Sequence, residues 1–379
     1  MKNRPDRIGI LGGGQLARMS AYAAYRLGFE VAIMEKHPNS PAGQLTHHEI
    51  VGWLHDDHLM RDFAAKSDVI TLENEFVDYQ RLEFLEALGT PVVPHSATIA
   101  NIQDKYLQKS ALADQNIPVP EFMAVQSLAD FEAVKSRLGV PFVLKSRKMG
   151  YDGYGNAQIE SQADFDTAFK RLTARHAALF AEKFITFHME LAVMIARTPA
   201  EIRAYPVVQT IQKNHICHTV IAPAPIDPQL AAQTVEMGIA AVKAVDGFGI
   251  YGIEFFLTED HQILLNEMAP RPHNSGHYTI EACVTSQFEN HIRAVLGLPL
   301  GTTEMIKPHA VMVNLLGKKE GTGVIPNYAI ALNHPELHLH IYGKAQSRIG
   351  RKMGHITMLG DNLNPILDQL HTIESQIWL

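Results

Sequence analysis

Short apolar runs and longer amphipathic stretches alternate along the whole chain, a pattern that predicts an α/β protein. Near the start, an apolar run is followed by three glycines, then by apolar residues at helical spacing, then by a second apolar run. This order is typical of a βαβ unit and predicts that residues 1–100 form a doubly wound, Rossmann-like domain. In this part we expect a helix at 15–27 and strands at 7–11, 31–35, 68–72 and 90–94.

The remaining pattern predicts a large second unit, residues 101–300, and a small third unit, residues 301–379. The stretch Ile117-Pro118-Val119-Pro120 follows a predicted helix and indicates a hinge, because proline interrupts helices. In the second unit we expect helices at 104–116, 227–245 and 279–296 and strands at 142–147, 157–160, 178–184, 205–212 and 215–222. In the third unit we expect strands at 310–315 and 337–342.

The stretch 252–277 carries the clearest chemical signal, two predicted strands around a tight turn. If Asp260 and His261 form a two-residue turn, Glu254 lies directly opposite Glu267 on one face of the hairpin. The neighbouring residues are apolar, so two facing carboxylates there need a proton or a cation between them. Mg²⁺ is commonly bound by carboxylates together with substrate phosphates. The alternative is a slipped register, with one glutamate facing solvent and nothing bound.

The first glycine turn allows three interpretations. Gly12, Gly14 and Ala17 match the G-x-G-x-x-G/A pattern, and Glu35 stands near the place of a ribose-binding acid, which favours an NAD-dependent oxidoreductase. A helix N-terminus also attracts any other phosphate, and the turn could serve only strand–helix packing. Glu75 follows a predicted strand at the edge where such sheets bind ligands, although an acid at this position more often caps a helix.

Two other segments fit an anionic ligand. Lys145 lies in an apolar predicted strand, where an ammonium group needs an anionic partner. The loop 148–156 that follows contains three glycines and could fold its backbone N–H groups over phosphates, or else form a simple hairpin turn. The third unit contains a basic loop that fits a phosphate or carboxylate site, or a solvated surface, and its cations are Lys344, Arg348, Arg351 and Lys352.

Composition excludes several classes of protein. The 379 residues are 46% hydrophobic and 19% charged, as in ordinary soluble proteins, and the net charge of −7 argues against a nucleic-acid binder. Only two cysteines are present, which suits a reducing compartment. No apolar run approaches the ~20 residues of a membrane span, and glycines interrupt the first run too early for a signal peptide. We therefore expect a cytoplasmic protein with no membrane and no nucleic-acid partner.

Several of these motifs together resemble one enzyme family. Glu254 and Glu267 resemble the metal-binding pair of the ATP-grasp ligases. Four runs resemble the 5-(carboxyamino)imidazole ribonucleotide synthases, ATP-grasp ligases of purine biosynthesis: GGGQLARM at 12–19, GYDG at 150–153, NEMAPRPHNSGH at 266–277 and GRKMGH at 350–355. The resemblance spans nearly the whole chain. It implies an ATP-grasp fold with an N-terminal Rossmann-like domain, a small C-terminal domain and a lid near residues 117–185.

The resemblance also implies roles for individual residues. It implies that Glu254 and Glu267 bind the metal and that Asp152, Arg271 and Lys344 are catalytic. The implied ATP contacts are Lys105, Lys145, Gly150, Tyr151, Asp152, Gly153, Gly155, Glu182, Lys183, Phe184, Ile185, Glu190, Gln212, Asn266 and Glu267. The implied substrate contacts are Gly14, Gln15, Leu16, Glu75, Tyr151, Arg271, His273, Asn274, Ser275, Lys344, Arg351 and Lys352.

The implied reaction consumes ATP, bicarbonate and 5-aminoimidazole ribonucleotide, with Mg²⁺ as cofactor, and carboxylates the exocyclic amine through carboxyphosphate. The resemblance also implies a homodimer. A non-catalytic regulator that binds Mg·ATP without turnover is a third hypothesis beside the ligase and the oxidoreductase. The oxidoreductase hypothesis leaves Glu254, Glu267 and the central glycine loop without roles.

Overall fold

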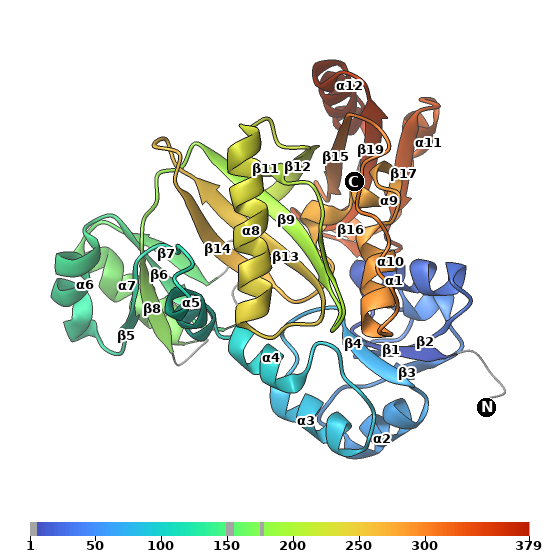
Figure 1. Cartoon of the computed structure of the whole chain (residues 1–379), viewed down its shortest axis with the longest axis horizontal. Coiled ribbons are helices and arrows are strands. Elements are labelled where there is room, and N and C mark those ends of the chain that lie inside the picture. The colour runs from blue at the N-terminus through green and yellow to red at the C-terminus, as the bar shows by residue number, and fades with distance from the viewer. Residues whose placement is uncertain (1–5, 149–154, 175–177, 379) are drawn as a thin grey trace.

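The computed structural model describes residues 6–148, 155–174 and 178–378, and the chain forms three main sheets within them (Figure 1). The first sheet is parallel, with strand order β3-β2-β1-β4. Its strands are β1 (Arg7–Leu11), β2 (Glu30–Glu35), β3 (Glu49–Val51) and β4 (Val69–Leu72). Its helices are α1 (Gln15–Arg26), α2 (Asp57–Ala65), α3 (Tyr79–Ala87) and α4 (Ser96–Ile102), with a 3₁₀ turn, η1 (Gly43–Leu45). This doubly wound arrangement confirms the predicted βαβ opening.

The expected strand at 90–94 is wrong in extent. Only Val92 forms a bridge, to Ile70 in parallel orientation. Pro91 and Pro94 flank it and have no N–H to donate, so a longer ladder cannot form.

The second sheet is small and antiparallel, with strand order β5-β8-β6-β7. Its strands are β5 (Phe122–Val125), β6 (Phe142–Ser146), β7 (Asn156–Ile159) and β8 (Leu179–Lys183). Helices α6 (Phe131–Leu138) and α7 (Gln162–Thr173) bury Phe131 and Phe165 against Phe142 of this sheet. The turn η2 (Leu128–Asp130) precedes α6, and α5 (Lys105–Asp114) joins this unit to the first domain.

The third sheet has nine strands and runs through the second and third predicted units without a break. Its path is β14-β13-β9-β11-β12-β15-β19-β17, and β10 pairs with β9. The strands are β9 (Met189–Arg197), β10 (Ile202–Ala204), β11 (Val208–Lys213), β12 (Ile216–Ala222), β13 (Gly249–Leu257), β14 (Ile263–Ala269), β15 (His309–Leu316), β17 (Leu337–Ile341) and β19 (Lys352–Gly360). The C-terminal strands β15, β17 and β19 therefore extend this sheet through the β12–β15 pair. Two short C-terminal strands, β16 (Gly321–Thr322) and β18 (Gln346–Ser347), form a separate two-stranded sheet.

Helices cover both faces of this sheet. Helix α8 (Pro228–Ala244) packs on one face, where Gly238 allows close approach to Val193 (Figure 1). On the other face lie α9 (Thr279–Ala282) and α10 (Gln287–Val295). The stretch 279–296, which we expected to be mostly helical, forms two helices, because Cys283 is extended and Ser286 caps a new helix. The remaining elements are η3 (Asn274–Gly276), β16 (Gly321–Thr322), α11 (Ala329–Leu332), β18 (Gln346–Ser347) and α12 (Leu363–Gln376).

The β13–β14 hairpin confirms the predicted pairing but reaches it by another route. Glu254 lies opposite Glu267, yet Leu257 pairs with Ile263, so the turn is longer than two residues. His261 adopts a left-handed conformation in that turn, with φ of 61°. A β-bulge beside Glu254 and Phe255 then restores the register. The longer turn and the bulge cancel each other, and the two carboxylates end up on the same face.

Within residues 6–148, 155–174 and 178–378, no helix combines the length and the apolar composition that a membrane crossing requires.

Candidate active site

The paired carboxylates of the hairpin form the centre of the site. Lys105, at the start of α5, places its Nζ 2.6 Å from Glu267 Oε2. Burial, together with the Glu267 carboxylate, raises the pKa of Glu254 to about 7. Burial opposes the charge of Lys105, but Glu267 outweighs it and raises the pKa of this ammonium group. One lysine therefore neutralises only one member of the pair.

His273 faces the second carboxylate without neutralising it. Its Nε2 lies 3.6 Å from Glu254 Oε1. Burial and the nearby Arg271 lower the pKa of His273 to about 3, so the imidazole is neutral at pH 7. The residues present thus fit a divalent cation, because Glu254 and Glu267 face each other with one negative charge uncompensated.

A second, deeper cluster consists of two lysines around Glu182. Lys109 Nζ lies 2.6 Å from Glu182 Oε2, and Lys145 bonds the other carboxylate oxygen. Lys109 also donates to the backbone oxygen of Asn266, at 2.9 Å, and so connects this cluster to the bulged hairpin strand. Burial would raise the pKa of Glu182, but the two ammonium groups outweigh it and hold this pKa at about 2.

Helix α5 is fixed at its first turn. Asp104 caps it by accepting from the backbone N–H groups of Tyr106 and Leu107, at 3.0 and 3.2 Å. The same carboxylate accepts from Arg147 Nε, at 2.9 Å, so the end of β6 is tied to the start of α5. This anchor directs Lys105 and Lys109, one helical turn apart, toward the hairpin.

Arg271 follows β14 and is held by the first domain. Its guanidinium bonds both oxygens of Glu75, with Nη2 3.2 Å from Oε1. Burial disfavours the Glu75 charge, but Arg271 outweighs it and lowers the pKa of this carboxyl group. The two-point contact fixes the guanidinium plane beside the carboxylate hairpin.

The first glycine turn points its N–H groups at two acids. Gly13 donates to Glu35 Oε2, at 2.8 Å, and Gly14 donates to Glu73 Oε2, at 2.6 Å. A Cβ on Gly14 would lie 2.1 Å from Glu73 Oε1, so a larger residue would displace the Glu73 carboxylate from this N–H group. Burial raises the pKa of Glu73. The backbone N–H groups at the start of α1 thus donate to carboxylates of the chain itself. This arrangement supports neither the hypothesis of a dinucleotide site nor that of a turn needed only for packing.

The C-terminal basic loop reaches the same place. Burial and the nearby Arg351 lower the pKa of Lys344 to about 7, while Glu73 acts in the opposite direction. Lys344 Nζ donates to the backbone oxygen of Lys352, at 2.7 Å, and Arg351 Nη1 donates to Gln346, also at 2.7 Å. Lys352 also acts electrostatically on Glu254. The structure thus brings the ends of the chain, the hairpin and Arg271 to one site.

Some predicted residues have internal partners instead. Asn274 is buried and exchanges two hydrogen bonds with Asn314, and Ser275 Oγ contacts His273 Nδ1 at 2.9 Å. Gln212 bonds Glu190, whose pKa burial raises. Their roles stay predictions.

The remaining predicted residues are placed as follows. After the buried Glu182, Lys183 and Phe184 are exposed and Ile185 is partly exposed. Gln15 and Leu16 begin α1. The backbone oxygen of Gly155 accepts from the backbone N–H of Ser146. Gly150, Tyr151, Asp152 and Gly153 lie outside the described residues.

Sequence reasoning missed Glu73 and Lys109. Glu73 is the first residue after β4, the position where open α/β sheets bind ligands, and this signal selected Glu75 instead. Lys109 lies one helical turn after Lys105 and looked like part of a solvated face, but only 2% of its side chain is exposed.

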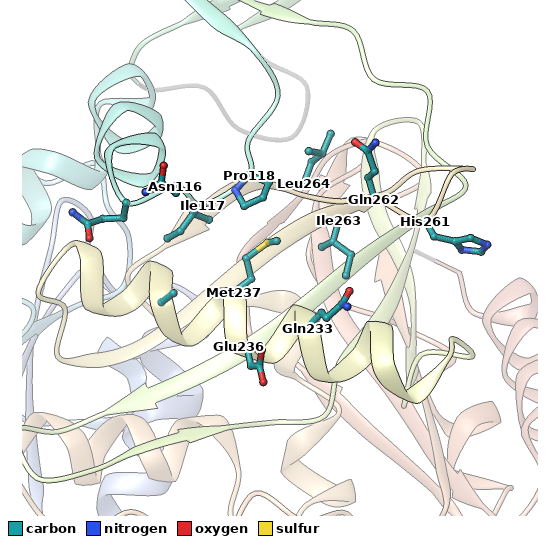
Figure 2. A pocket seen from close by; sticks show the side chains of 12 residues that line it. Asn116, Ile117, Pro118, Gln233, Glu236, Met237, His261, Gln262, Ile263 and Leu264 are labelled. Atoms are coloured by element: carbon teal, nitrogen blue, oxygen red, sulfur yellow. The ribbon is translucent and has the colours of Figure 1, made fainter.

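A hollow of about 630 Å³ lies away from these residues, between α8, the turn of the hairpin and the end of α5 (Figure 2). Met237, Ile263 and Pro118 point toward it in Figure 2. None of the predicted site residues lines it.

Comparisons with known proteins cover almost the entire chain. The ribonucleotide synthetase preATP-grasp domain matches residues 6–103, the ATP-grasp domain matches 110–288, and the phosphoribosylaminoimidazole carboxylase C-terminal domain matches 310–369. A phosphoribosylaminoimidazole carboxylase of Ogataea methanolica is 43% identical over 97% of this chain and 69% of its own length. The N5-carboxyaminoimidazole ribonucleotide synthase of Synechococcus elongatus is 41% identical over 93% of this chain and 89% of its own length.

A crystal structure agrees with these matches. The N5-carboxyaminoimidazole synthase of Aspergillus clavatus, in complex with ADP and 5-aminoimidazole ribonucleotide, superposes with a TM-score of 0.89. It is 36% identical, and the match covers 98% of each chain. The chain therefore belongs to the N5-carboxyaminoimidazole ribonucleotide synthase family of ATP-grasp ligases.

Proposed function

We propose that this protein carboxylates the exocyclic amine of 5-aminoimidazole ribonucleotide with ATP and bicarbonate, giving the N5-carboxyamino product, ADP and phosphate. The observation that carries the proposal is the convergence of three segments. The hairpin carboxylates, the Arg271–Glu75 pair and the Lys344 loop lie around one site, although they are far apart in sequence. The carboxylates would hold the Mg²⁺ that accompanies ATP, and Arg271 and the Lys344 loop supply positive charge for bicarbonate and for the ribose phosphate.

The ATP end of the site has to neutralise a triphosphate and align it. We assign Lys105 and Lys145 to the phosphates, because each already binds a carboxylate that could yield to a stronger anion. Glu254 and Glu267 would hold Mg²⁺, which when bound supplies charge neutralisation to the β- and γ-phosphates. Lys109 positions Glu182 and the backbone of Asn266 behind these groups. Glu182 to Ile185 would line the adenine.

The bicarbonate end depends on Arg271. Bicarbonate is a poor electrophile, and its phosphorylation gives carboxyphosphate, which has a leaving group. Arg271 keeps a guanidinium edge beside the hairpin through its contact with Glu75, and we assign it to bicarbonate and carboxyphosphate. Water must be kept from this intermediate. We propose that the segment 117–185 acts as the lid and that Asp152 orients or deprotonates the substrate amine.

The ribonucleotide would be anchored by the glycine turn and the C-terminal loop. Lys344, Arg351 and Lys352 supply positive charge for the ribose phosphate. Gly14, Gln15 and Leu16 supply the start of a helix facing that charge. Glu73 already links the two through Gly14 and through its electrostatic effect on Lys344.

The test is an ADP-release assay with both co-substrates. We expect ADP release to require bicarbonate and 5-aminoimidazole ribonucleotide together. Glu267→Gln should abolish it and leave folding intact, whereas Glu259→Gln, an exposed acid in the same hairpin turn, should be as active as the wild type. Turnover with another acid and amine only would indicate a different ligase. Mg·ATP binding without any turnover would indicate a regulator.

We also propose that the protein is a cytoplasmic homodimer with domains 1–100, 101–300 and 301–379. Light scattering coupled to size-exclusion chromatography should give twice the 42.1 kDa chain mass. A mass equal to one chain at assay concentrations would contradict this.

A further inference from the structure

A cluster of histidines and one glutamate lies where α9 meets the C-terminal strands, apart from the hairpin carboxylates. Glu281 on α9 accepts from His340 on β17, with Oε1 2.6 Å from Nε2. His340 and His355 are directly opposite each other on β17 and β19, and their rings stack with centroids 4.3 Å apart. One ligand atom from each of the three residues lies within 4.8 Å of the other two.

Two polar atoms of this cluster are buried and have no hydrogen-bond partner among the described residues. They are Glu281 Oε2 and His355 Nε2. His355 is fully buried, and its Nδ1 lies 2.8 Å from the Tyr342 hydroxyl. The Glu281–His340 contact occupies neither atom, so an ion pair alone does not explain the arrangement. Orphaned buried atoms of this kind indicate an unseen ion or water.

We propose that Glu281, His340 and His355 bind a divalent transition metal ion, with zinc as the best chemical match. Two imidazole nitrogens and one carboxylate oxygen are a ligand set typical of zinc, which accepts water as its fourth ligand. The Tyr342 hydroxyl can accept from Nδ1 of His355, which leaves Nε2 free to bind a metal and fixes the ring. The His340 side chain is 25% exposed, which provides an entry path.

The charge states suit this ligand set. Burial lowers the pKa of His355 well below its ordinary value, so its imidazole is neutral as a ligand must be. His277 also lies nearby, its ring centroid 5.2 Å from that of His355, and burial likewise keeps it neutral. Gln287 donates to His277 Nδ1, which leaves the proton on Nε2. This Nε2 has no hydrogen-bond partner among the described residues, and because it is protonated His277 is not a fourth ligand.

A metal here would connect two parts of the active site from behind. Helix α9 follows Arg271 and His273 in the chain, and β19 begins at Lys352. The ion would hold α9 against β17 and β19 and so help to fix the positions of Arg271 and Lys352. This role is separate from the chemistry of the hairpin carboxylates, because no residue is shared between the two sites.

The experiment titrates the EDTA-treated full-length protein with cobalt(II) and then zinc(II). We expect one saturable equivalent of cobalt per chain, seen by its visible absorption and displaced by zinc, and a zinc-dependent rise in the unfolding temperature. Glu281→Gln and His340→Gln should each weaken binding at least about tenfold. His338→Gln, an exposed histidine on the same strand, should not weaken it.

The Glu267→Gln background separates this site from the hairpin carboxylates, because cobalt uptake should persist there. Equal cobalt uptake by the wild type and His340→Gln would overturn the proposal. The absence of any saturable cobalt uptake would also overturn it, and this result is expected if a water molecule fills the cluster. Unfolding temperatures measured in EDTA check that each variant folds. If one variant does not fold, the other variant and the zinc-dependent unfolding temperature of the wild type decide the question.

Discussion

Replacing Glu254 with glutamine should abolish activity and yet stabilise the metal-free protein above neutral pH. The pKa of Glu254 is raised from 4.5 to about 7, chiefly by burial and by Glu267. Between these two values the unfolded chain has released a proton that the folded chain still holds. Stability therefore falls as the pH rises through this window.

The size of the effect follows from the shift. A rise from 4.5 to about 7 corresponds to about 3 kcal/mol of destabilisation above pH 7. However, 33% of the Glu254 side chain is exposed, and solvent screening reduces this to about 1–2 kcal/mol. Glutamine keeps the shape and carries no charge. We expect Glu254→Gln to unfold about 1–3 °C higher than the wild type at pH 8 and at nearly the same temperature at pH 5.

The assay is thermal unfolding in EDTA at both pH values, beside the ADP-release assay. Mg²⁺ should raise the unfolding temperature of the wild type at pH 8 and have little effect on the variant, because the ion relieves the repulsion that glutamine removes. Glu259→Gln, on the exposed turn of the same hairpin, should show none of these differences. An unfolding temperature of Glu254→Gln that is equal to or below that of the wild type at pH 8 would refute the reasoning.

Three further predictions concern the cations of the site. Lys109→Met should lower the free energy of unfolding by about 2–3 kcal/mol at pH 7, because it leaves Glu182 buried with one ammonium partner. This difference from the wild type should shrink as the pH falls from 4.5 toward 2, and denaturant unfolding at several pH values would measure it. Glu75→Gln should lower kcat for ADP release about 10–100-fold with an unchanged KM for ATP, because Arg271 loses the contact that orients it; an unchanged kcat would contradict this. The KM for the ribonucleotide should rise about tenfold between pH 7 and pH 8.5, because Lys344 loses its proton above about 7, and this rise should vanish in Lys344→Gln.

The hairpin shows why pairing is easier to predict than geometry. The pairing of Glu254 with Glu267 was predicted from a two-residue turn at Asp260 and His261, and the pairing is confirmed although the turn is longer. The bulge beside Glu254 offsets the longer turn and leaves the two carboxylates facing each other. The register argument was therefore right only because the bulge compensates for the longer turn.

The local sequence pattern gave wrong predictions where contacts between distant segments of the chain determine whether a side chain is buried. Lys109 has the sequence context of a solvated helical face, but it is buried against Glu182, which lies 73 positions later in the chain, on strand β8. The histidine cluster likewise joins residues from α9, β17 and β19 that no spacing rule connects. The strand expected at 90–94 failed for a local reason, because the two prolines weigh more than the apolar pattern.

The charges of the site explain why many of its residues could be predicted from the sequence. A buried carboxylate or ammonium group destabilises the folded chain unless a partner is supplied, so each one implies a counterpart. Glu182 has two ammonium partners and Glu75 has Arg271, but the hairpin pair has Lys105 for one carboxylate and a neutral imidazole for the other. Lys352 also acts electrostatically on Glu254, yet the pKa of this carboxyl group stays raised, to about 7. The imbalance in charge lowers the stability of the metal-free protein at pH 8, and it is the feature on which the proposed binding of Mg²⁺ depends.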